Sequence, residues 1–250
     1  MYQYSEIFQR SSLLLGQDAM TRLQTARVII FGVGGVGSWC AESLVRTGFM
    51  NVTIVDCDVV SVTNINRQAM ATTATVGLPK VEVMKKRLLE INSAANVTAY
   101  NMVFSEQTAG EFNLDGYDFI IDAIDSLKDK VRLILSACNT GAKFFSSMGA
   151  ALKTDPSKVK TAEFWKVEGC PLARALRKKF KAMGQFPSRK FVCVYSDEQP
   201  PAQSQTIANQ DCTPIIKPVT NGSIVHITAI FGFTIAGMVV RCAMEDVGAL

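Results

Sequence analysis

Paired cysteines are missing from this sequence. The chain of 250 residues contains seven cysteines, but no two of them are spaced as C-x-x-C. Zinc sites and disulfide frameworks use closely and regularly spaced cysteines, so we predict neither, and the expected compartment is the reducing cytoplasm. Histidine is also scarce, with His226 alone. We expect His226 to be a hydrogen-bonded interior residue, so hydrolase chemistry that needs a histidine-activated nucleophile is disfavoured.

Charge is absent from residues 218–240, which contain no Lys, Arg, Asp or Glu. A stretch of that length could form a membrane-spanning helix. Its asparagine, serine, histidine and threonines dilute the apolar character, so a helix buried at the core of a homodimer is favoured and no stable membrane insertion is expected. Peripheral association with a membrane stays open as an alternative. The first ten residues have no apolar core, so no secretory signal is expected.

Positive charge is concentrated in one part of the chain. Residues 151–190 contain eleven Lys or Arg and three acidic residues, a net charge of +8 in a chain whose net charge is +4. Such a concentration is typical of a surface that binds a polyanion. The alternative is a solvated helical face around Arg174–Lys181. Nucleic acid is the slightly favoured partner of this basic segment.

The sequence Gly-Val-Gly-Gly-Val-Gly at residues 32–37 follows an apolar strand, Val28–Phe31, and opens a helix. This arrangement places backbone N–H groups and a helix N-terminus where a phosphate can bind. Asp56 ends the next strand, 19 residues past Gly37, a spacing that suits a carboxylate bound to ribose hydroxyls. NAD and ATP both satisfy this pattern. The candidate nucleotide-binding glycines are Gly32, Gly34, Gly35 and Gly37.

The residues that follow favour ATP over NAD. Asp58 is followed by Asn64, Arg67 and Gln68, and then by Lys80 at the start of a predicted helix. A triphosphate with Mg²⁺ needs cations and neutral donors together. Arg67 and Lys80 can neutralise phosphate oxygens, while Asn64 and Gln68 can donate hydrogen bonds. We expect Asp58 to pair with Arg67 or the metal, with a turn-capping carboxylate as the alternative.

A second pair of carboxylates follows a buried strand near residues 117–121, in the sequence Asp122-Ala-Ile-Asp125. Carboxylates at the C-terminal end of a parallel strand face the ligand crevice. Mg²⁺ binds one or two carboxylates together with phosphate oxygens. We therefore predict Asp125 as the Mg²⁺ ligand and expect Asp122 to be structural.

These motifs together resemble those of the ubiquitin-activating-enzyme-like adenylyltransferases. The shared pattern is GVGGVGS, then D-x-D-x-V-x-x-x-N-x-N-R-Q, G-x-x-K and D-A-I-D. Within that superfamily the chain looks most like the tRNA threonylcarbamoyladenosine dehydratases, on the basis of Gly35–Trp39, Asp122–Ser126 and Thr228–Phe233. Relatives that activate small sulfur-carrier proteins usually contain two C-x-x-C pairs that bind zinc, and this sequence contains none.

The resemblance implies an enzyme that activates a carboxylate as an acyl-adenylate, with ATP and Mg²⁺. By this resemblance Asp56 would hold the ribose, Arg67 and Lys80 the phosphates, and Asp125 the metal. Arg10 would cross a homodimer interface to the partner's ATP. The substrate would be threonylcarbamoyladenosine in the anticodon stem-loop of tRNA, which would be cyclised with loss of water while AMP and pyrophosphate are released.

Two other functions remain open. The first is activation of the C-terminus of a ubiquitin-like sulfur carrier, with Cys193 as the better candidate over Cys212 for carrying an acyl group or sulfur, and with sulfur-transfer accessory proteins as partners. The second is a nucleotide-sensing or NAD-binding protein without adenylation. Replacing Arg67 should abolish turnover of an adenylating enzyme and leave a simple nucleotide binder nearly intact.

Alternating strands and helices from residue 26 onward predict a Rossmann-like, doubly wound α/β fold with a mainly parallel sheet. We expect an N-terminal arm at 1–25 and an ATP-binding core at 26–150. Residues 151–250 should add a substrate-binding insertion and an apolar C-terminal helix for dimerisation, all within one compact unit. Residues 197–210 are predicted to be a polar loop.

Overall fold

The computed structural model describes residues 2–199, 206–208 and 219–249. Seven strands form one sheet in the order β3-β2-β1-β4-β5-β7-β6, which is parallel except where β6 pairs with β7. The predicted mainly parallel α/β fold is therefore confirmed. The strands are β1 Arg27–Phe31, β2 Asn51–Val55, β3 Asn96–Tyr100, β4 Phe119–Asp122, β5 Lys143–Ser147, β6 Val159–Glu163 and β7 Val192–Ser196.

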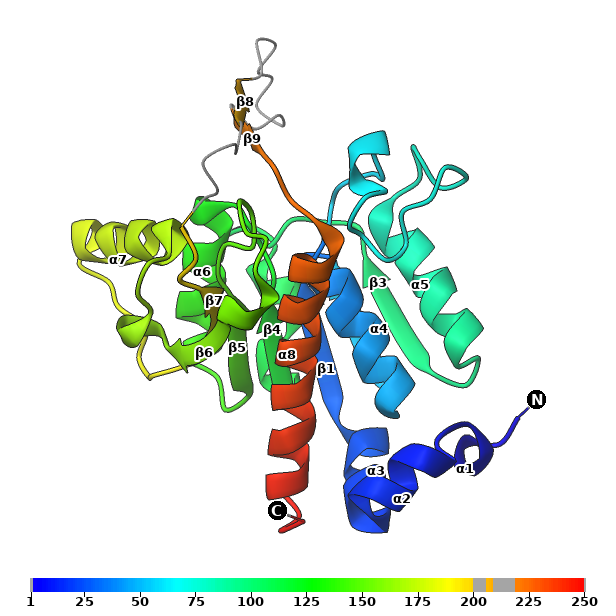
Figure 1. The fold of residues 1–250 in the computed structure, drawn as a ribbon. Coiled ribbons are helices and arrows are strands. Elements are labelled where there is room, and N and C mark those ends of the chain that lie inside the picture. The colour runs from blue at the N-terminus through cyan, green and yellow to red at the C-terminus, as the bar shows by residue number, and fades with distance from the viewer. Residues whose placement is uncertain (1, 200–205, 209–218, 250) are drawn as a thin grey trace.

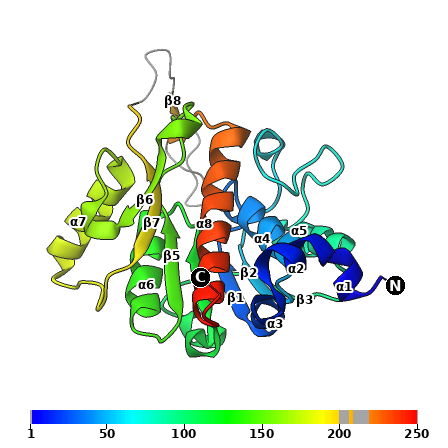
Figure 2. The same ribbon diagram turned by 60° about the horizontal axis from the view of Figure 1, so that its bottom comes forward.

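Helices cover both faces of this sheet (Figures 1 and 2). One hydrophobic core joins the sheet to α4, α5 and α8, and a second core joins its other face to α6 and α7. The longer helices are α3 Gln17–Thr25, α4 Gly37–Thr47, α5 Lys80–Ile91, α6 Leu127–Cys138, α7 Pro171–Met183 and α8 Val225–Glu245; the N-terminal arm consists of α1 Tyr4–Ile7 and α2 Gln9–Leu15.

The central strand β1 shows why the sheet is buried on both sides. Val28, Ile29, Ile30 and Phe31 have no exposed surface. A continuous apolar run, rather than an alternating one, is typical of a parallel strand with helices on both faces. The carboxyl ends of β1, β2 and β4 therefore meet at one edge, where a ligand can bind.

Helix α8 packs closely against α4 (Figure 1). A Cβ added at Gly232 would lie 2.5 Å from the carbonyl oxygen of Val36, so only glycine permits this approach. Helix α8 is long and apolar enough to cross a membrane, since its most apolar window has a mean hydropathy of 1.8. Half of that window is buried inside the protein.

Strands β6 and β7 of the predicted insertion 151–250 pair with each other and extend the core sheet. Two details differ from the sequence predictions. Part of the predicted loop 197–210 is the short strand β8 Thr206–Ala208, which pairs with β9 Val219–Asn221. His226 is exposed rather than interior, although it does form a hydrogen bond, with its Nε2 atom 2.9 Å from the Thr154 carbonyl oxygen.

Candidate functional site

The glycine loop between β1 and α4 is shaped by close backbone packing. Gly32 has φ +88°, and a Cβ there would lie 2.7 Å from the Ala123 carbonyl oxygen. A Cβ at Gly37 would lie 1.8 Å from the Gly32 carbonyl oxygen. Both positions require glycine for the internal structure of the loop. The turn alone explains the glycines at these two positions, so they are not evidence for a bound ligand.

The two middle glycines differ from each other. A Cβ at Gly35 would meet Thr228 of α8 at 3.0 Å, so this glycine allows α8 to pack on the loop. A Cβ at Gly34 would meet only Gln68 Nε2, at 3.9 Å. No internal contact requires glycine at position 34, and the free space there is suited to a bound phosphate.

Asp56 lies at the carboxyl end of β2 beside this loop. One carboxylate oxygen accepts a hydrogen bond from Val33 N at 2.7 Å, and the other accepts one from Asp58 N at 2.9 Å. Burial raises the pKa of Asp56, and Lys80 and the two N–H groups only partly oppose this. The carboxylate is thus fixed in place, and each oxygen keeps a second lone pair for a ribose hydroxyl.

Lys80 forms an ion pair with Asp58. The ammonium nitrogen lies 2.7 Å from the Asp58 carboxylate, and the Lys80 N–H donates to the Asp58 carbonyl oxygen at 2.9 Å. Lys80 is buried while the carboxylate of Asp58 is largely exposed. Arg67 was one expected partner of Asp58, and the structure gives Lys80 in its place. The pairing arises because residues 59–79 return the chain to β2, where Val60 N bonds to Leu78 O.

The predicted polar cluster forms a compact turn. The side-chain oxygen of Asn64 accepts a hydrogen bond from Ser61 N at 3.0 Å and so caps the turn Val62–Asn64. Gln68 is buried, and its side-chain oxygen has no hydrogen-bond partner among the described residues. A buried polar atom without a partner is costly, so a ligand that donates to it would fit this position.

Arg67 is half-buried near Asp125. Its guanidinium donates to the Thr63 carbonyl oxygen at 2.8 Å and to the Asn66 side chain at 3.0 Å. Burial lowers the pKa of Arg67, and the nearby Asp125 carboxylate partly compensates. The predicted phosphate-binding cation and the predicted metal ligand therefore face one region of the crevice.

Trp39, which sequence analysis missed as a site residue, supports the turn that carries Arg67. Its indole N–H donates to the Arg67 carbonyl oxygen at 2.9 Å, and its ring packs edge-on against Phe233 of α8. The side chain of Asn66 donates to the Ser223 carbonyl oxygen at 2.8 Å. The entry to α8 therefore fixes this turn, a contact between segments about 160 residues apart.

Asp122 is structural, as predicted, and its partner Lys130 was missed. Lys130 lies 2.7 Å from Asp122 with both side chains fully buried, and Ser146 Oγ donates to the same carboxylate. Burial raises the pKa of Asp122, against the effect of Lys130. The sequence did contain a sign that Lys130 is buried, because it lies at helical spacing from Leu133 and Ile134 on the apolar side of α6.

Two predicted site residues lie away from this crevice. Arg10 is exposed in α2, and α2 lies at the opposite end of the sheet from the glycine loop (Figure 1). Within one chain Arg10 therefore does not reach the site. Cys193 is fully buried in β7, and burial raises its thiol pKa well above the ordinary value. An acyl-carrying thiolate needs exposure and a lowered pKa, so the structure argues against that role for Cys193. Cys212 lies outside the described residues.

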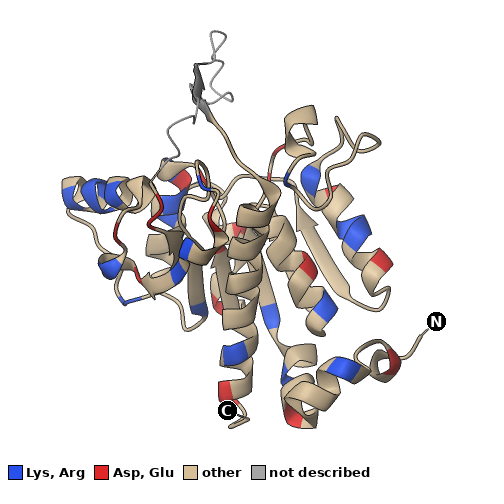
Figure 3. Ribbon diagram, viewed as in Figure 1, with Lys and Arg blue, Asp and Glu red and all other residues tan. Residues whose placement is uncertain are grey.

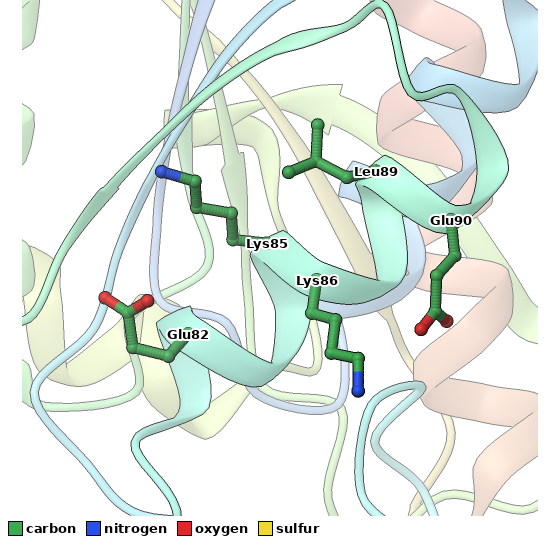
Figure 4. A pocket seen from close by; sticks show the side chains of 5 residues that line it. All are labelled: Glu82, Lys85, Lys86, Leu89 and Glu90. Carbon is green, nitrogen blue, oxygen red and sulfur yellow. The ribbon is translucent and has the colours of Figure 1, made fainter. Parts of the chain in front are cut away.

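The donor set of this edge fits ATP with Mg²⁺ better than a protein-bound metal. Among the described residues, Asp56, Cys57 and Asp58 are the group of potential ligands that lie close together. Asp56 is already bound by backbone N–H groups and Asp58 by Lys80. Asp125 is the predicted Mg²⁺ ligand, and a carboxylate together with phosphate oxygens is a common ligand set for this ion. A surface hollow lined by side chains of α5 is separate from this site (Figure 4).

The basic segment 151–190 divides into structural and free cations. Lys153 and Arg189 donate to backbone carbonyl oxygens, Arg177 does so twice, and Lys160 pairs with Asp197. The other seven are exposed and form no ion pair with another described residue; α7 carries most of them (Figure 3). They are Lys158, Lys166, Arg174, Lys178, Lys179, Lys181 and Lys190.

The chain is similar in sequence to known enzymes. Over 193 residues the chain is 38% identical to the tRNA threonylcarbamoyladenosine dehydratase of Bacillus subtilis (strain 168), covering 77% of this chain and 75% of that protein. It is 34% identical over 240 residues to the enzyme of the same name from Haemophilus influenzae, covering 92% and 90%.

Among solved structures, the fold is similar to that of Escherichia coli tRNA N6-threonylcarbamoyladenosine dehydratase in complex with ATP. The TM-score is 0.86 at 29% identity, covering 98% of this chain and 96% of that one. The model of the ThiF family matches residues 8–246. The chain belongs to the ThiF family.

Proposed function

We propose that this protein is an ATP-dependent dehydratase that adenylates the carboxylate of threonylcarbamoyladenosine in tRNA and then closes it into a ring. The observation that carries the proposal is the set of side chains around the glycine loop: Asp56 accepts from Val33 N of that loop, the Lys80–Asp58 ion pair follows it, and the Asp125 carboxylate acts on the pKa of Arg67. The similar proteins named as this dehydratase, one of them solved with ATP, support it.

The reaction has two steps. A carboxylate oxygen of the modification attacks the α-phosphorus of ATP, and pyrophosphate leaves. An atom of the same modification then attacks the activated carbonyl carbon, the ring closes and AMP leaves with the original carboxylate oxygen. The nucleoside loses one water in total, and no external acyl acceptor is required.

The residues of the site would divide this work. Asp56 accepts hydrogen bonds from the ribose, and the backbone N–H groups beside Gly34 bind phosphate. Lys80 and Arg67 neutralise charge that develops on the α-phosphate and the leaving pyrophosphate. Mg²⁺, held by Asp125 and phosphate oxygens, would supply further charge neutralisation.

Lys80 is already paired, so ATP must compete for it. Lys80 is buried in that pair, but Asp58 remains largely exposed. Water can therefore solvate the Asp58 carboxylate when a phosphate replaces it at the ammonium group. The Asp58–Lys80 pair would hold the lysine in position until the nucleotide binds.

The free cations of the basic segment would bind the RNA. Arg174, Lys178 and Lys181 follow helical spacing on the exposed side of α7, opposite the buried Leu176 and Phe180. Phosphate contacts of this kind position a nucleic acid without reading its sequence. We propose this side of α7 as the contact for the tRNA backbone.

A homodimer and a cytoplasmic location are part of the proposal. Arg10 lies far from the ATP edge of its own chain, so a role at the site requires a partner subunit. Leu13 and Leu14 of α2 and Phe233 of α8 are exposed apolar side chains that a second copy could cover. Half-burial of α8 in its own chain favours this location over stable insertion in a membrane.

Cys193 does not support the alternative function, activation of a sulfur carrier, because it is buried with a raised pKa. The other candidate for that function, Cys212, lies outside the described residues.

The test uses ATP labelled at the α-phosphate with purified protein and Mg²⁺. One reaction contains tRNA that carries threonylcarbamoyladenosine, and its control contains the unmodified transcript. The proposal predicts AMP only with the modified tRNA, and a digested nucleoside lighter by one water. Absence of AMP with both tRNAs, despite measurable ATP binding, would refute it.

A further inference from the structure

Two exposed aromatic rings meet on the basic segment, outside the site described above. Trp165 lies in the short 3-10 helix Phe164–Lys166 and Phe186 lies just after α7. Their side chains are 40% and 53% exposed, their ring centroids are 6.2 Å apart, and their planes are inclined at 44°. Met183, 40% exposed, is in the last turn of α7. Large apolar side chains brought together at a surface commonly mark an interaction site.

The ring of Trp165 is supported by a buried aromatic layer. Its centroid lies 5.1 Å from that of Phe164, which is fully buried and stacks on Phe191 at 5.0 Å. Arg177 lies over the Phe164 ring and donates to the carbonyl oxygens of Phe164 and Val167. The exposed pair therefore sits on a fixed base and can bind a ligand without first being ordered.

Three exposed lysines are sequence neighbours of the aromatic residues in this part of the chain. Lys166 follows Trp165 directly, Lys181 is in the last turn of α7, and Lys190 precedes Phe191. All three are exposed, and none forms an ion pair within the part of the chain that the structure describes. An apolar protein partner would have to desolvate these charges, whereas a nucleic acid offers phosphates to them and the π-face of a base to the rings.

The pair lies at the edge of the sheet opposite the ATP site. Strand β6 runs antiparallel to β7, and its last residue, Glu163, pairs with Val192, the first residue of β7. Because β7 is parallel to β5, this is the edge where the parallel strands begin. Five residues of strand, about 17 Å, separate the two edges. A base bound here is therefore a different nucleotide from the one under modification.

We propose that Trp165 and Phe186 form a stacking platform for an unpaired base of the RNA substrate, distant from the modified adenosine. This inference rests on the proposed function, and it adds a second RNA contact to the phosphate contacts of α7. The platform would contribute to the affinity for RNA, so ATP binding and the chemical step should not depend on Trp165 or Phe186.

The experiment measures binding of a tRNA transcript by tryptophan fluorescence and by a filter assay at fixed salt. Stacking of a base should quench Trp165. Trp165→Ala and Phe186→Ala should each weaken tRNA binding about ten-fold, while Trp165→Phe should keep the affinity and lose most of the quenching. Lys166→Gln should reduce the slope of log Kd against log salt by about one. The control is Val103→Ala, an exposed apolar residue beyond β3 at the far side of the sheet, which should change none of these.

The outcomes separate this inference from the proposed function. If the wild-type protein binds and dehydrates tRNA but Trp165→Ala binds it equally well, the platform is refuted and the function stands. If the wild-type protein binds no tRNA, both are refuted. If Trp165→Ala instead abolishes a concentration-dependent dimer seen by light scattering and leaves tRNA binding intact, the surface is a protein interface and the RNA assignment is wrong.

Discussion

The ammonium group of Lys130 lies 2.7 Å from a carboxylate oxygen of Asp122, and neither side chain is exposed to solvent. Lys130 also donates to the Ile124 carbonyl oxygen at 2.9 Å, and the Ile124 N–H donates to the other Asp122 oxygen at 3.1 Å. The buried pair therefore binds both backbone polar groups of the residue before Asp125. It fixes the turn that carries the proposed metal ligand.

Replacing one member of this ion pair should lower the free energy of unfolding strongly, whereas replacing both members should not. Lys130→Met leaves a buried, unpaired carboxylate, which should lower the free energy of unfolding by about 3–5 kcal/mol. Combining it with Asp122→Leu should recover most of that loss, because two buried charges are then replaced by apolar groups. Urea denaturation measures both. The exposed pair Arg241–Glu245 is the control, and Arg241→Gln should cost less than about 1 kcal/mol. A loss that small for Lys130→Met would contradict this account.

The glycines of the loop should respond differently to alanine. Gly37→Ala places a Cβ 1.8 Å from a carbonyl oxygen and should prevent stable folding. Gly34→Ala meets no close internal contact, so its melting temperature should stay near that of the wild type while its ATP affinity falls by about ten-fold or more. Thermal melting and calorimetric titration with ATP measure the two effects. Unchanged ATP affinity in Gly34→Ala would show that phosphate does not bind there.

Nucleotide affinity should fall in acid because of Asp56. Burial raises the pKa of Asp56, so its protonation begins at a higher pH than that of an exposed aspartate, and the neutral acid accepts ribose hydroxyls less well. ATP affinity should therefore decline as pH falls through this raised pKa. The free energy of unfolding depends on pH in the opposite sense. The stabilisation from Asp56 is largest below the pKa that it has in the unfolded chain, and it is lost as pH rises through its pKa in the folded protein. Titrations with ATP across pH test the first statement. Asp56→Asn should bind weakly at every pH, whereas Glu42→Gln, away from the site, should keep the wild-type profile.

Arg67 separates an adenylating enzyme from a nucleotide binder. Because its proposed role is to neutralise charge in the transition state, Arg67→Ala should reduce AMP formation by about 10²–10³-fold and change ATP affinity far less. The matched control is Arg46→Ala, an exposed arginine of α4 paired with Glu42, which should retain activity. Turnover by Arg67→Ala at the wild-type rate would favour the simple nucleotide binder.

Local patterns in the sequence were enough to predict the sheet, the glycine turn and the edge where the carboxylates meet. The apolar run Val28–Phe31, the glycines and Asp56 each depend on neighbours within one βαβ unit. Such patterns can be interpreted without knowing which distant segments are in contact. The fold class and the family follow from these residues.

The partners of the site residues could not be predicted in the same way. Asp58 meets Lys80 because of the path of the intervening loop, and Trp39 holds Arg67 because α8 returns to pack on α4. Cys193 was a candidate for carrying an acyl group or sulfur, yet it is buried in the core. Each depends on tertiary packing, which periodicity does not encode.

The central claim is that the carboxylate of the modification attacks the α-phosphorus of ATP. It is tested most directly with tRNA whose threonylcarbamoyladenosine carries oxygen-18 in its carboxylate. The account predicts that one labelled oxygen appears in AMP as the ring forms, as measured by mass spectrometry. Labelled inorganic phosphate together with ADP would show attack at the γ-phosphorus instead, and would contradict adenylation.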